Sequence, residues 1–459
     1  MTPWLAAALD YIPRWLEFQI RQGEHVGLSL AIAHQGRPVL AQAFGHADLG
    51  TGQRLTPQHR FRIASHSKTF TATAVMLLRE QGRLQLDDPI GRHVHGLHPR
   101  VAAATLMQLL SHSAGLVRDG RDAGQWVERR PFLNEAELRA DLADGPSIEV
   151  NTRFKYSNHG YALLGMAIES VTGQTYADWL TRNVVAASGL TDTLPDAPAQ
   201  GASPLASGHS GKWPLGQRVV IPATMHTRSL TAAAGFISTA SDLVRLFGSL
   251  SPLAKKSVLS VASRRELTRP QWREPHASAE RWYGLGTMSG RVAGWDWFGH
   301  TGGFPGTLTR TACLPAQGLV ISALTNAADG PCQAWVDGVM HILQAFEKHG
   351  APTRQSSPWT GRWWSLWGAV DLLPVKDKVL VANPALNNPV QDAAELAELS
   401  RDRDGTRHGR IVLANGFAAH GESVALSLDA RGKARAFQLA GGRLLPEAAV
   451  AKELRARYG

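Results

Sequence analysis

The sequence predicts an α+β protein in which an antiparallel sheet is flanked by helices, followed by a small antiparallel β-barrel or sandwich domain. β-like runs form hairpin patterns near both ends of the first part, and amphipathic helical patterns lie between them. A stretch rich in Gly, Pro and Ser then precedes five more β-like runs. For a chain of 459 residues, we predict one large domain over residues 1–347, a linker over residues 348–358 and a β-rich domain over residues 359–459.

The composition is that of an ordinary globular protein, with 44% hydrophobic and 19% charged residues, which excludes a disordered chain or a coiled coil. The formal net charge is +10. Because the Arg and Lys residues are scattered along the chain, we expect a solvated basic surface and no nucleic-acid partner. Cys313 and Cys332 are the only cysteines, and we interpret them as buried thiols.

Residues 1–22 have the pattern of an amphipathic helix. Asp10, Arg14 and Glu17 interrupt its apolar residues, so the segment lacks the apolar core of a signal peptide. No run of 18 or more apolar residues occurs elsewhere, which argues against a membrane span. We therefore expect a cytoplasmic protein, or a periplasmic one if a leader was removed.

The next elements are a hairpin and a short helix. Residues 28–33 and 38–43 are β-like runs joined by a turn, and residues 105–116 indicate a short helix that ends in a glycine-containing turn. The closely spaced histidines between residues 92 and 98 have no carboxylate or cysteine at a familiar zinc spacing. We therefore predict no metal site.

Ser65 and Lys68 stand three residues apart at the predicted start of a helix. The helical spacing is carried by the apolar residues Phe70, Ala74, Leu77 and Leu78, and Gly82 is the predicted C-terminal cap. A serine hydroxyl needs a base to act as a nucleophile, and a buried neutral lysine one turn away can supply it. The free N–H groups of a helix N-terminus also suit an oxyanion. The alternative interpretation is a helix cap beside a solvated lysine.

A second polar cluster, residues 153–161, precedes a strongly periodic helix that Gly173 should end. Tyr156 and Asn158 alternate along this segment, so both side chains could face one cleft. A tyrosine there can relay a proton, and an asparagine amide can hold both a lysine and a substrate carbonyl. The alternative is a helix cap formed by Ser157 or Asn158.

A third cluster, residues 297–306, is rich in glycine and is followed by two antiparallel β-like runs, residues 308–314 and 319–324. Glycine at a strand end lets a substrate approach the backbone closely, and an exposed backbone N–H there can complete an oxyanion hole. Alone, the same cluster could be a flexible turn.

Together, the SxxK, YxN and HTG motifs resemble the serine β-lactamase and penicillin-binding-protein superfamily, in particular its class C β-lactamase-like serine hydrolase and D-peptidase branch. The resemblance covers about residues 10–345 and extends to the sequence segments at residues 86–90, 109–116 and 234–243. It implies a β-lactamase/transpeptidase-like fold, with an all-helical subdomain beside the antiparallel sheet.

The resemblance also implies roles for individual residues. Ser65 would be the acylated nucleophile, Lys68 its proton acceptor and Tyr156 a relay to the leaving group. The side chain of Asn158 would bind the acyl amide of the substrate. The substrate would lie along a strand edge formed by His300, Thr301 and Gly302, and the backbone N–H groups of Ser65 and Gly303 would form the oxyanion hole. No metal or organic cofactor is implied.

The motif departs from the usual KTG of class C β-lactamases at His300. A histidine is a weaker cation at neutral pH, so the resemblance favours an amidase or peptidase on small amides or short peptides, including those with D-residues, over a β-lactamase. D-aminopeptidase, D-amidase and carboxypeptidase-like activities fit. A carboxylesterase or weak β-lactamase is the alternative within the family, and a penicillin-binding-type ligand sensor is the non-enzymatic one.

The β-like runs beyond the linker resemble the β-rich C-terminal extensions, including lipocalin-like ones, of some serine hydrolases of this family. Four tryptophans stand at the start of this domain, at positions 359, 363, 364 and 367. We expect them to pack in its core or between domains rather than to line a substrate site. The domain could cover the cleft or mediate a homodimer.

Overall fold

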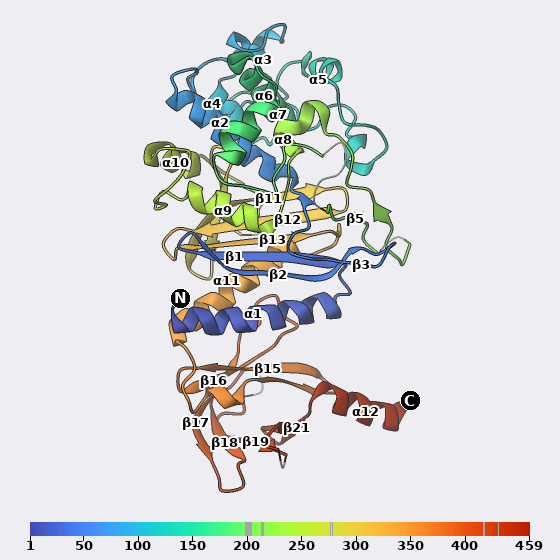
Figure 1. The fold of residues 1–459 in the computed structure, drawn as a ribbon, viewed down its shortest axis with the longest axis vertical. Coiled ribbons are helices and arrows are strands. Elements are labelled where there is room, and N and C mark those ends of the chain that lie inside the picture. The colour runs from blue at the N-terminus through green and yellow to red at the C-terminus, as the bar shows by residue number, and fades with distance from the viewer. Residues whose placement is uncertain (198–203, 213–214, 276, 278, 416–417, 430) are drawn as a thin grey trace. The chain divides into compact units, whose positions relative to one another are not determined.

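A computed structural model describes residues 1–197, 204–212, 215–275, 277, 279–415, 418–429 and 431–459 (Figure 1). The chain forms two compact units. One unit is residues 25–336, and the other combines residues 1–24 with residues 337–459. The predicted division at residues 348–358 stays a prediction.

The unit of residues 25–336 is built on a nine-stranded antiparallel sheet with the order β3-β2-β1-β13-β12-β11-β10-β9-β8. Its strands are β1 (Gly27–His34), β2 (Arg37–Asp48), β3 (Gln53–Arg54), β8 (Trp272–Arg273), β9 (Arg281–Tyr283), β10 (Met288–Val292), β11 (Trp295–Phe304), β12 (Thr307–Leu314) and β13 (Leu319–Thr325). The two predicted hairpins are present as β1–β2 and β12–β13. The sheet brings strands from both ends of this unit together, because β1 pairs with β13.

Helices gather beside this sheet (Figure 1). They are α2 (Ser67–Glu80), α3 (Pro99–Ala102), α4 (Leu106–Leu110), α5 (Glu135–Leu142), α6 (Asn158–Thr172), α7 (Tyr176–Leu180), α8 (Thr231–Ala234), α9 (Ala240–Leu250) and α10 (Val261–Thr268). Helix α9 packs on β1, β12 and β13, whereas α2, α6 and α8 pack on one another. The predicted α+β class and helical subdomain are confirmed.

Two short strand pairs complete this unit. They are β4 (Phe61–Arg62) with β7 (Ile237–Ser238), and β5 (Gly208–His209) with β6 (Val220–Ile221). The β4–β7 pair lies directly before the predicted nucleophile, so it fixes where the chain enters that helix.

The other unit contains an eight-stranded antiparallel sheet. Its strands are β14 (Gly361–Ser365), β15 (Gly368–Val375), β16 (Lys378–Ala382), β17 (Ala394–Arg401), β18 (Arg407–Leu413), β19 (Ser423–Leu428), β20 (Ala434–Leu439) and β21 (Gly442–Leu444). A bridge between Trp364 and Leu445 joins the two end strands, with backbone N–O distances of 2.8 and 2.9 Å. The predicted barrel or sandwich is therefore a nearly closed barrel.

The described residues of the barrel unit form α-helices as well as strands. They are α1 (Pro3–Gln22), α11 (Cys332–His349), which begins in the other unit, and α12 (Glu447–Tyr458). Trp359 and Trp363 lie in the barrel core, Trp364 packs on Phe18 of α1, and Trp367 is exposed. The tryptophans thus serve mainly packing within this unit.

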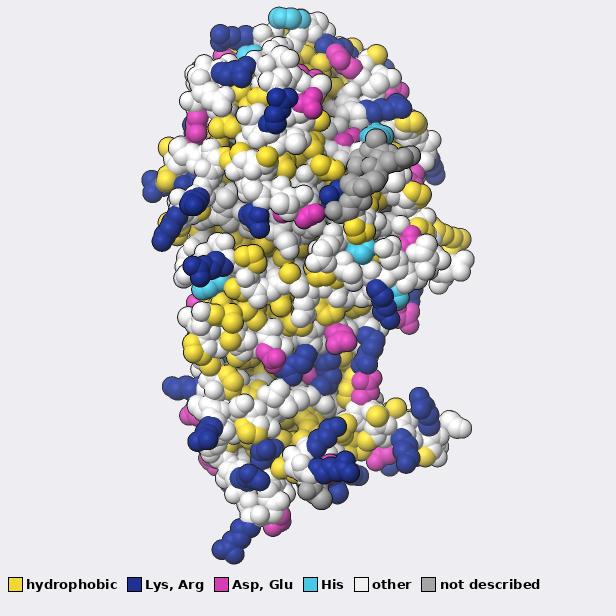
Figure 2. All heavy atoms as spheres, in the orientation of Figure 1, with side chains coloured by type: hydrophobic (Ala, Val, Ile, Leu, Met, Phe, Trp, Pro, Cys, Tyr) yellow, Lys and Arg dark blue, Asp and Glu magenta, His cyan; other side chains and the backbone are white. Residues whose placement is uncertain are grey.

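Charged side chains of both signs are interspersed on the face shown in Figure 2, with no continuous basic stripe on that face. Within the described part of the chain, no helix has the length and apolarity needed to cross a bilayer. The same residues contain no group of three or more His, Cys, Asp or Glu side chains placed to hold a metal ion. Both cysteines are free and buried.

Candidate active site

Ser65 lies in a short 3-10 turn, Ala64–His66, which runs directly into α2. Ala64 has φ 48°, a left-handed conformation that costs energy for a residue with a side chain. The Ile63 N–H donates to the Phe236 carbonyl at 3.0 Å, which holds the entrance to this turn beside β7. Ser65 therefore stands at a sharp bend rather than inside the regular helix.

The ring of His66 anchors this turn to the sheet. His66 Nδ1 lies 3.1 Å from Thr309 Oγ1 and Nε2 lies 3.0 Å from Thr311 Oγ1, both on β12. Burial lowers the pKa of His66 to about 3, so the ring is neutral. Its role in the structure is to hold the segment around Ser65 against β12.

Lys68 lies on the first turn of α2, fully buried. Its Nζ donates to Asn158 Oδ1 at 2.7 Å and to the Ala233 carbonyl at 2.9 Å, and it lies 3.4 Å from Ser65 Oγ. Burial lowers the pKa of Lys68 well below its ordinary value. A neutral amine has two N–H groups and one lone pair, so the two carbonyl oxygens use its donors and leave the lone pair for the Ser65 hydroxyl.

Tyr156 approaches the same serine oxygen. Its O–H donates to Ser65 Oγ at 2.8 Å. Burial raises the pKa of Tyr156 above its ordinary value, so the phenol keeps its proton. Lys68 Nζ lies 4.7 Å from the centroid of the Tyr156 ring. Ser65 Oγ is thus in contact with one group able to accept a proton and another able to donate one.

Asn158 is oriented by a carboxylate that the sequence did not indicate. Its Nδ2 donates to Asp119 Oδ1 at 2.5 Å, and the Trp126 indole N–H donates to the same oxygen at 2.9 Å. Arg118 pairs with the other oxygen of Asp119 at 3.0 Å. Because Asp119 accepts from the amide nitrogen, the amide oxygen of Asn158 must face Lys68.

Strand β11 approaches the serine turn at Gly302. A Cβ added to Gly302 would lie 2.3 Å from the Ile63 carbonyl oxygen and 2.4 Å from Thr309 Oγ1. Only glycine allows this approach. Strand β10 pairs with β11 as far as Gly299, so Thr301 and Gly303 lie on a segment that β10 does not cover. Such a segment can present a backbone N–H to a substrate oxygen.

His300 points into the protein interior. Its Nδ1 lies 2.6 Å from the Thr301 carbonyl, which can only accept, so Nδ1 carries a proton and Nε2 accepts from the Tyr283 O–H at 3.0 Å. Burial lowers the pKa of His300 well below its ordinary value. His300 is therefore neutral, with both ring nitrogens bonded inside the protein.

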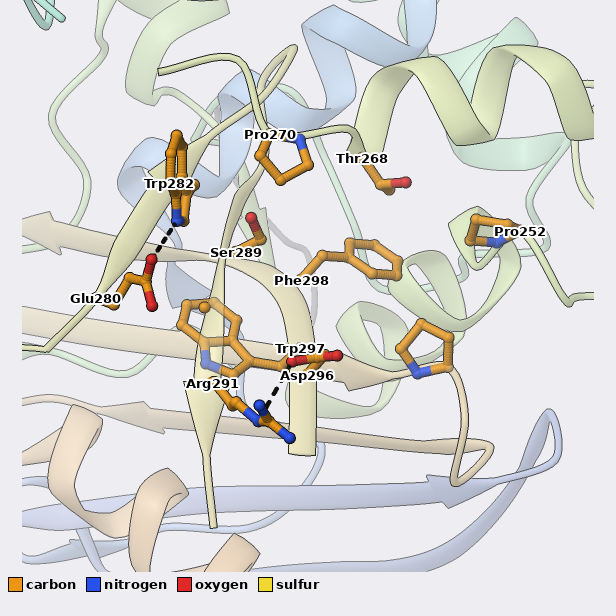
Figure 3. Close-up of a pocket in the computed structure, with 12 residues that line it drawn as sticks. Pro252, Thr268, Pro270, Glu280, Trp282, Ser289, Arg291, Asp296, Trp297 and Phe298 are labelled. Carbon is orange, nitrogen blue, oxygen red and sulfur yellow. Dashed lines mark hydrogen bonds and ion pairs between the residues drawn. The ribbon is translucent and has the colours of Figure 1, made fainter. Parts of the chain in front are cut away.

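A cavity of about 330 Å³ adjoins this site through Trp126, whose ring lines it while its N–H binds Asp119. A larger cavity of about 460 Å³ lies elsewhere, between the end of α10 and strands β9 to β11 (Figure 3). There Glu280 accepts from the Trp282 indole at 3.1 Å, and Arg291 pairs with Asp296 at 3.7 Å. The described residues that line it include none of the candidate catalytic side chains.

The structure brings Ser65, Lys68, Tyr156 and Asn158 into direct contact, although their roles stay predictions. Sequence reasoning missed Asp119 and assigned no role to His112, which lies within the sequence segment at residues 109–116. The predicted helix caps are also present, because Ser157 caps α6 and Gly173 ends it at φ 68°. The cap is formed by Ser157, so it leaves the Asn158 side chain available for the predicted role.

Residues 13–334 match the family model described as Beta-lactamase. Penicillin-binding protein 4* of Bacillus subtilis (strain 168) is 29% identical to this chain over 180 residues, which are 38% of this chain and 40% of that protein. The chain spans about two fifths of the length of the curated relatives it matches.

Solved structures show the same fold over longer stretches. The octameric penicillin-binding protein homologue from Pyrococcus abyssi covers 95% of this chain and 99% of its own, with a TM-score of 0.66 and 22% identity. The D-amino acid amidase from Ochrobactrum anthropi SV3, complexed with L-phenylalanine amide, covers 74% of this chain and 99% of its own, with a TM-score of 0.63 and 25% identity.

Proposed function

The chain belongs to the Beta-lactamase family, whose members are typically serine hydrolases, and on this premise we propose that it hydrolyses small amides or short peptides through an acyl-enzyme on Ser65. The observation that carries the proposal is the pair of contacts at Ser65 Oγ. Lys68 Nζ, whose pKa is lowered by burial, lies 3.4 Å away, and the Tyr156 O–H donates at 2.8 Å. This is the arrangement that an activated serine nucleophile requires.

In the proposed acylation, Ser65 Oγ attacks the substrate carbonyl carbon while Lys68 accepts the serine proton. The backbone N–H groups of Ser65 and Gly303 bind the oxyanion. Tyr156 donates its proton to the leaving nitrogen as the C–N bond breaks, and recovers a proton from the Lys68 ammonium. The amine therefore leaves neutral, and both groups return to their starting states.

Deacylation reuses the same groups. Lys68 accepts a proton from water as the water oxygen attacks the ester carbonyl carbon. The bond between Ser65 Oγ and the acyl carbon breaks, and the departing oxygen takes the proton back from Lys68. The product acid leaves, and Ser65 is restored.

The state of His300 favours a substrate that has no free carboxylate beside β11. Both of its ring nitrogens bond within the protein, and burial disfavours the imidazolium form that could attract a carboxylate. Arg118 is already paired with Asp119. An amide or aminopeptidase substrate therefore fits better than a carboxypeptidase substrate or a β-lactam. The likeness to a D-amino acid amidase supports an amide and makes D-stereochemistry the first choice to test.

The test is a panel of matched L- and D-amino acid amides, D-alanyl dipeptides, a β-lactam and an aryl ester. We expect multiple turnovers on amides with a preference for one stereoisomer, and at least ~10³-fold less activity in Ser65→Ala. A stoichiometric burst without turnover would indicate a ligand sensor instead. Equal hydrolysis by Ser65→Ala would refute the proposal.

A further inference from the structure

We propose that His112 is a positioning residue for this reaction: it holds Tyr156 from three sides so that the phenol points at Ser65. The inference rests on the proposed function, because it concerns the same serine. His112 lies in the turn that follows α4 and is 1% exposed.

Backbone N–H groups on both sides of Tyr156 in the sequence donate hydrogen bonds to His112. The Lys155 N–H donates to the His112 carbonyl at 2.8 Å, and the Ser157 N–H donates to His112 Nδ1 at 3.1 Å. The two neighbours of Tyr156 are therefore both bonded to one residue. This fixes the backbone direction of the segment that carries the phenol.

The third contact is between the rings. The centroids of His112 and Tyr156 are 4.1 Å apart with an interplanar angle of 35°. Phe154, Tyr161 and Tyr283 also surround the imidazole, with centroids 5.7, 5.1 and 4.7 Å away. Close packing of this kind fixes the imidazole, so one face of the Tyr156 ring lies against a rigid surface.

The imidazole supplies shape rather than a charge. Since Nδ1 accepts the Ser157 N–H, the proton of the neutral ring is on Nε2, which has no hydrogen-bond partner among the described residues. Burial lowers the pKa of His112 well below its ordinary value. His112 also has φ 60°, a left-handed conformation that suits few residues with side chains.

Such support matters because the relay depends on a 2.8 Å contact between the Tyr156 O–H and Ser65 Oγ. A shift of about 1 Å in a reacting group can cost ~100-fold in rate. Loss of either support should therefore lower kcat while the substrate-binding groups, and with them KM, stay in place.

The test separates the two supports. His112→Phe keeps a ring against Tyr156 but removes the acceptor of the Ser157 N–H. His112→Asn keeps an acceptor and tolerates the left-handed backbone but removes the ring. We expect each variant to lower kcat about 10-fold or more, with KM changed less than about twofold. If His112→Phe does not fold, His112→Asn alone still tests the proposal.

His59 offers a matched control. It is also buried, its Nδ1 accepts a backbone N–H from Thr56 at 3.0 Å, and its Nε2 has no partner among the described residues. His59→Phe and His59→Asn should lose comparable thermal stability but keep kcat within about twofold. A similar fall in kcat in these variants would assign the His112 effect to general destabilisation and overturn the proposal.

A double-mutant cycle with Tyr156→Phe gives the sharper readout. Once the phenol hydroxyl is removed, its orientation toward Ser65 no longer affects the rate. His112→Asn should therefore change kcat less than about twofold in the Tyr156→Phe background. The same fold loss in both backgrounds would overturn the inference. Ser65→Ala runs in parallel, because activity that survives it refutes the proposed function itself rather than the role of His112.

Discussion

At the scale of single residues, the central feature is a lysine whose surroundings lower its pKa well below the ordinary value. Lys68 is bonded to two carbonyl oxygens in a buried site, which makes its protonated form costly. Asp119 favours the charged form of Lys68, whereas Arg118 opposes it. Burial is the largest of these effects, so the pKa of Lys68 is lowered and the free amine that the proposed base requires is favoured.

The pH dependence of kcat/KM should therefore show an acid limb set by Lys68. The active form is the free amine, so activity falls as pH drops through the lowered pKa and levels off above it. Lys68→Arg places a permanent cation there, so kcat/KM should fall by about 10²- to 10⁴-fold on the plateau above that pKa and the acid limb should disappear. A profile for Lys68→Arg that retains the acid limb and the rate would contradict this assignment.

At the scale of elements, the site depends on how closely β11 approaches the turn that carries Ser65. A Cβ on Gly302 would clash with the Ile63 carbonyl, and Thr309 of β12 binds both that carbonyl and His66. The sheet thus supports the turn that carries Ser65 through backbone packing, which a side chain on residue 302 would disturb.

Gly302→Ala should destabilise the protein by about 1–3 kcal/mol, because the added methyl must displace backbone atoms rather than a mobile side chain. Urea unfolding measures this loss. Gly303→Ala is the matched control, since a Cβ added there would lie at an ordinary 3.5 Å from Leu308 Cδ2. Equal stability losses in the two variants would show that the close approach at Gly302 is not the cause.

The helices around the site could be predicted from the sequence. Apolar spacing predicted α2 and α6, and cap residues placed their ends near Gly82 and Gly173. The bend at Ala64 could not be predicted, because alanine carries no left-handed preference and the conformation is imposed by β7 and β11. Asp119 was missed for a similar reason: it lies in a loop without a pattern, and only the fold brings it to Asn158.

At the scale of the whole molecule, the chain contributes its two ends to one unit. The barrel unit includes α1, and Tyr11 of that helix donates to Asp371 of β15 at 2.8 Å. Arg362 of β14 binds both oxygens of the same carboxylate, at 2.7 and 2.8 Å. The β-like runs predicted five of the eight strands, but no local signal linked residues 1–22 to them.

Asp371 is 3% exposed, so removing its cation should be costly. Arg362→Ala should destabilise the barrel unit by about 3–5 kcal/mol, because it leaves a buried carboxylate without a counter-charge. The double variant Arg362→Ala/Asp371→Asn should recover part of that loss. Chemical unfolding followed by tryptophan fluorescence can compare them, and a double variant no more stable than the single one would argue against the charge explanation.

The central claim, that Ser65 forms the acyl-enzyme, is tested most directly by intact-protein mass spectrometry after rapid mixing with an aryl ester and acid quenching. We expect one acyl group per chain, located to Ser65 by peptide mapping, and none on Ser65→Ala. An adduct on another residue, or an undiminished adduct on Ser65→Ala, would contradict the account.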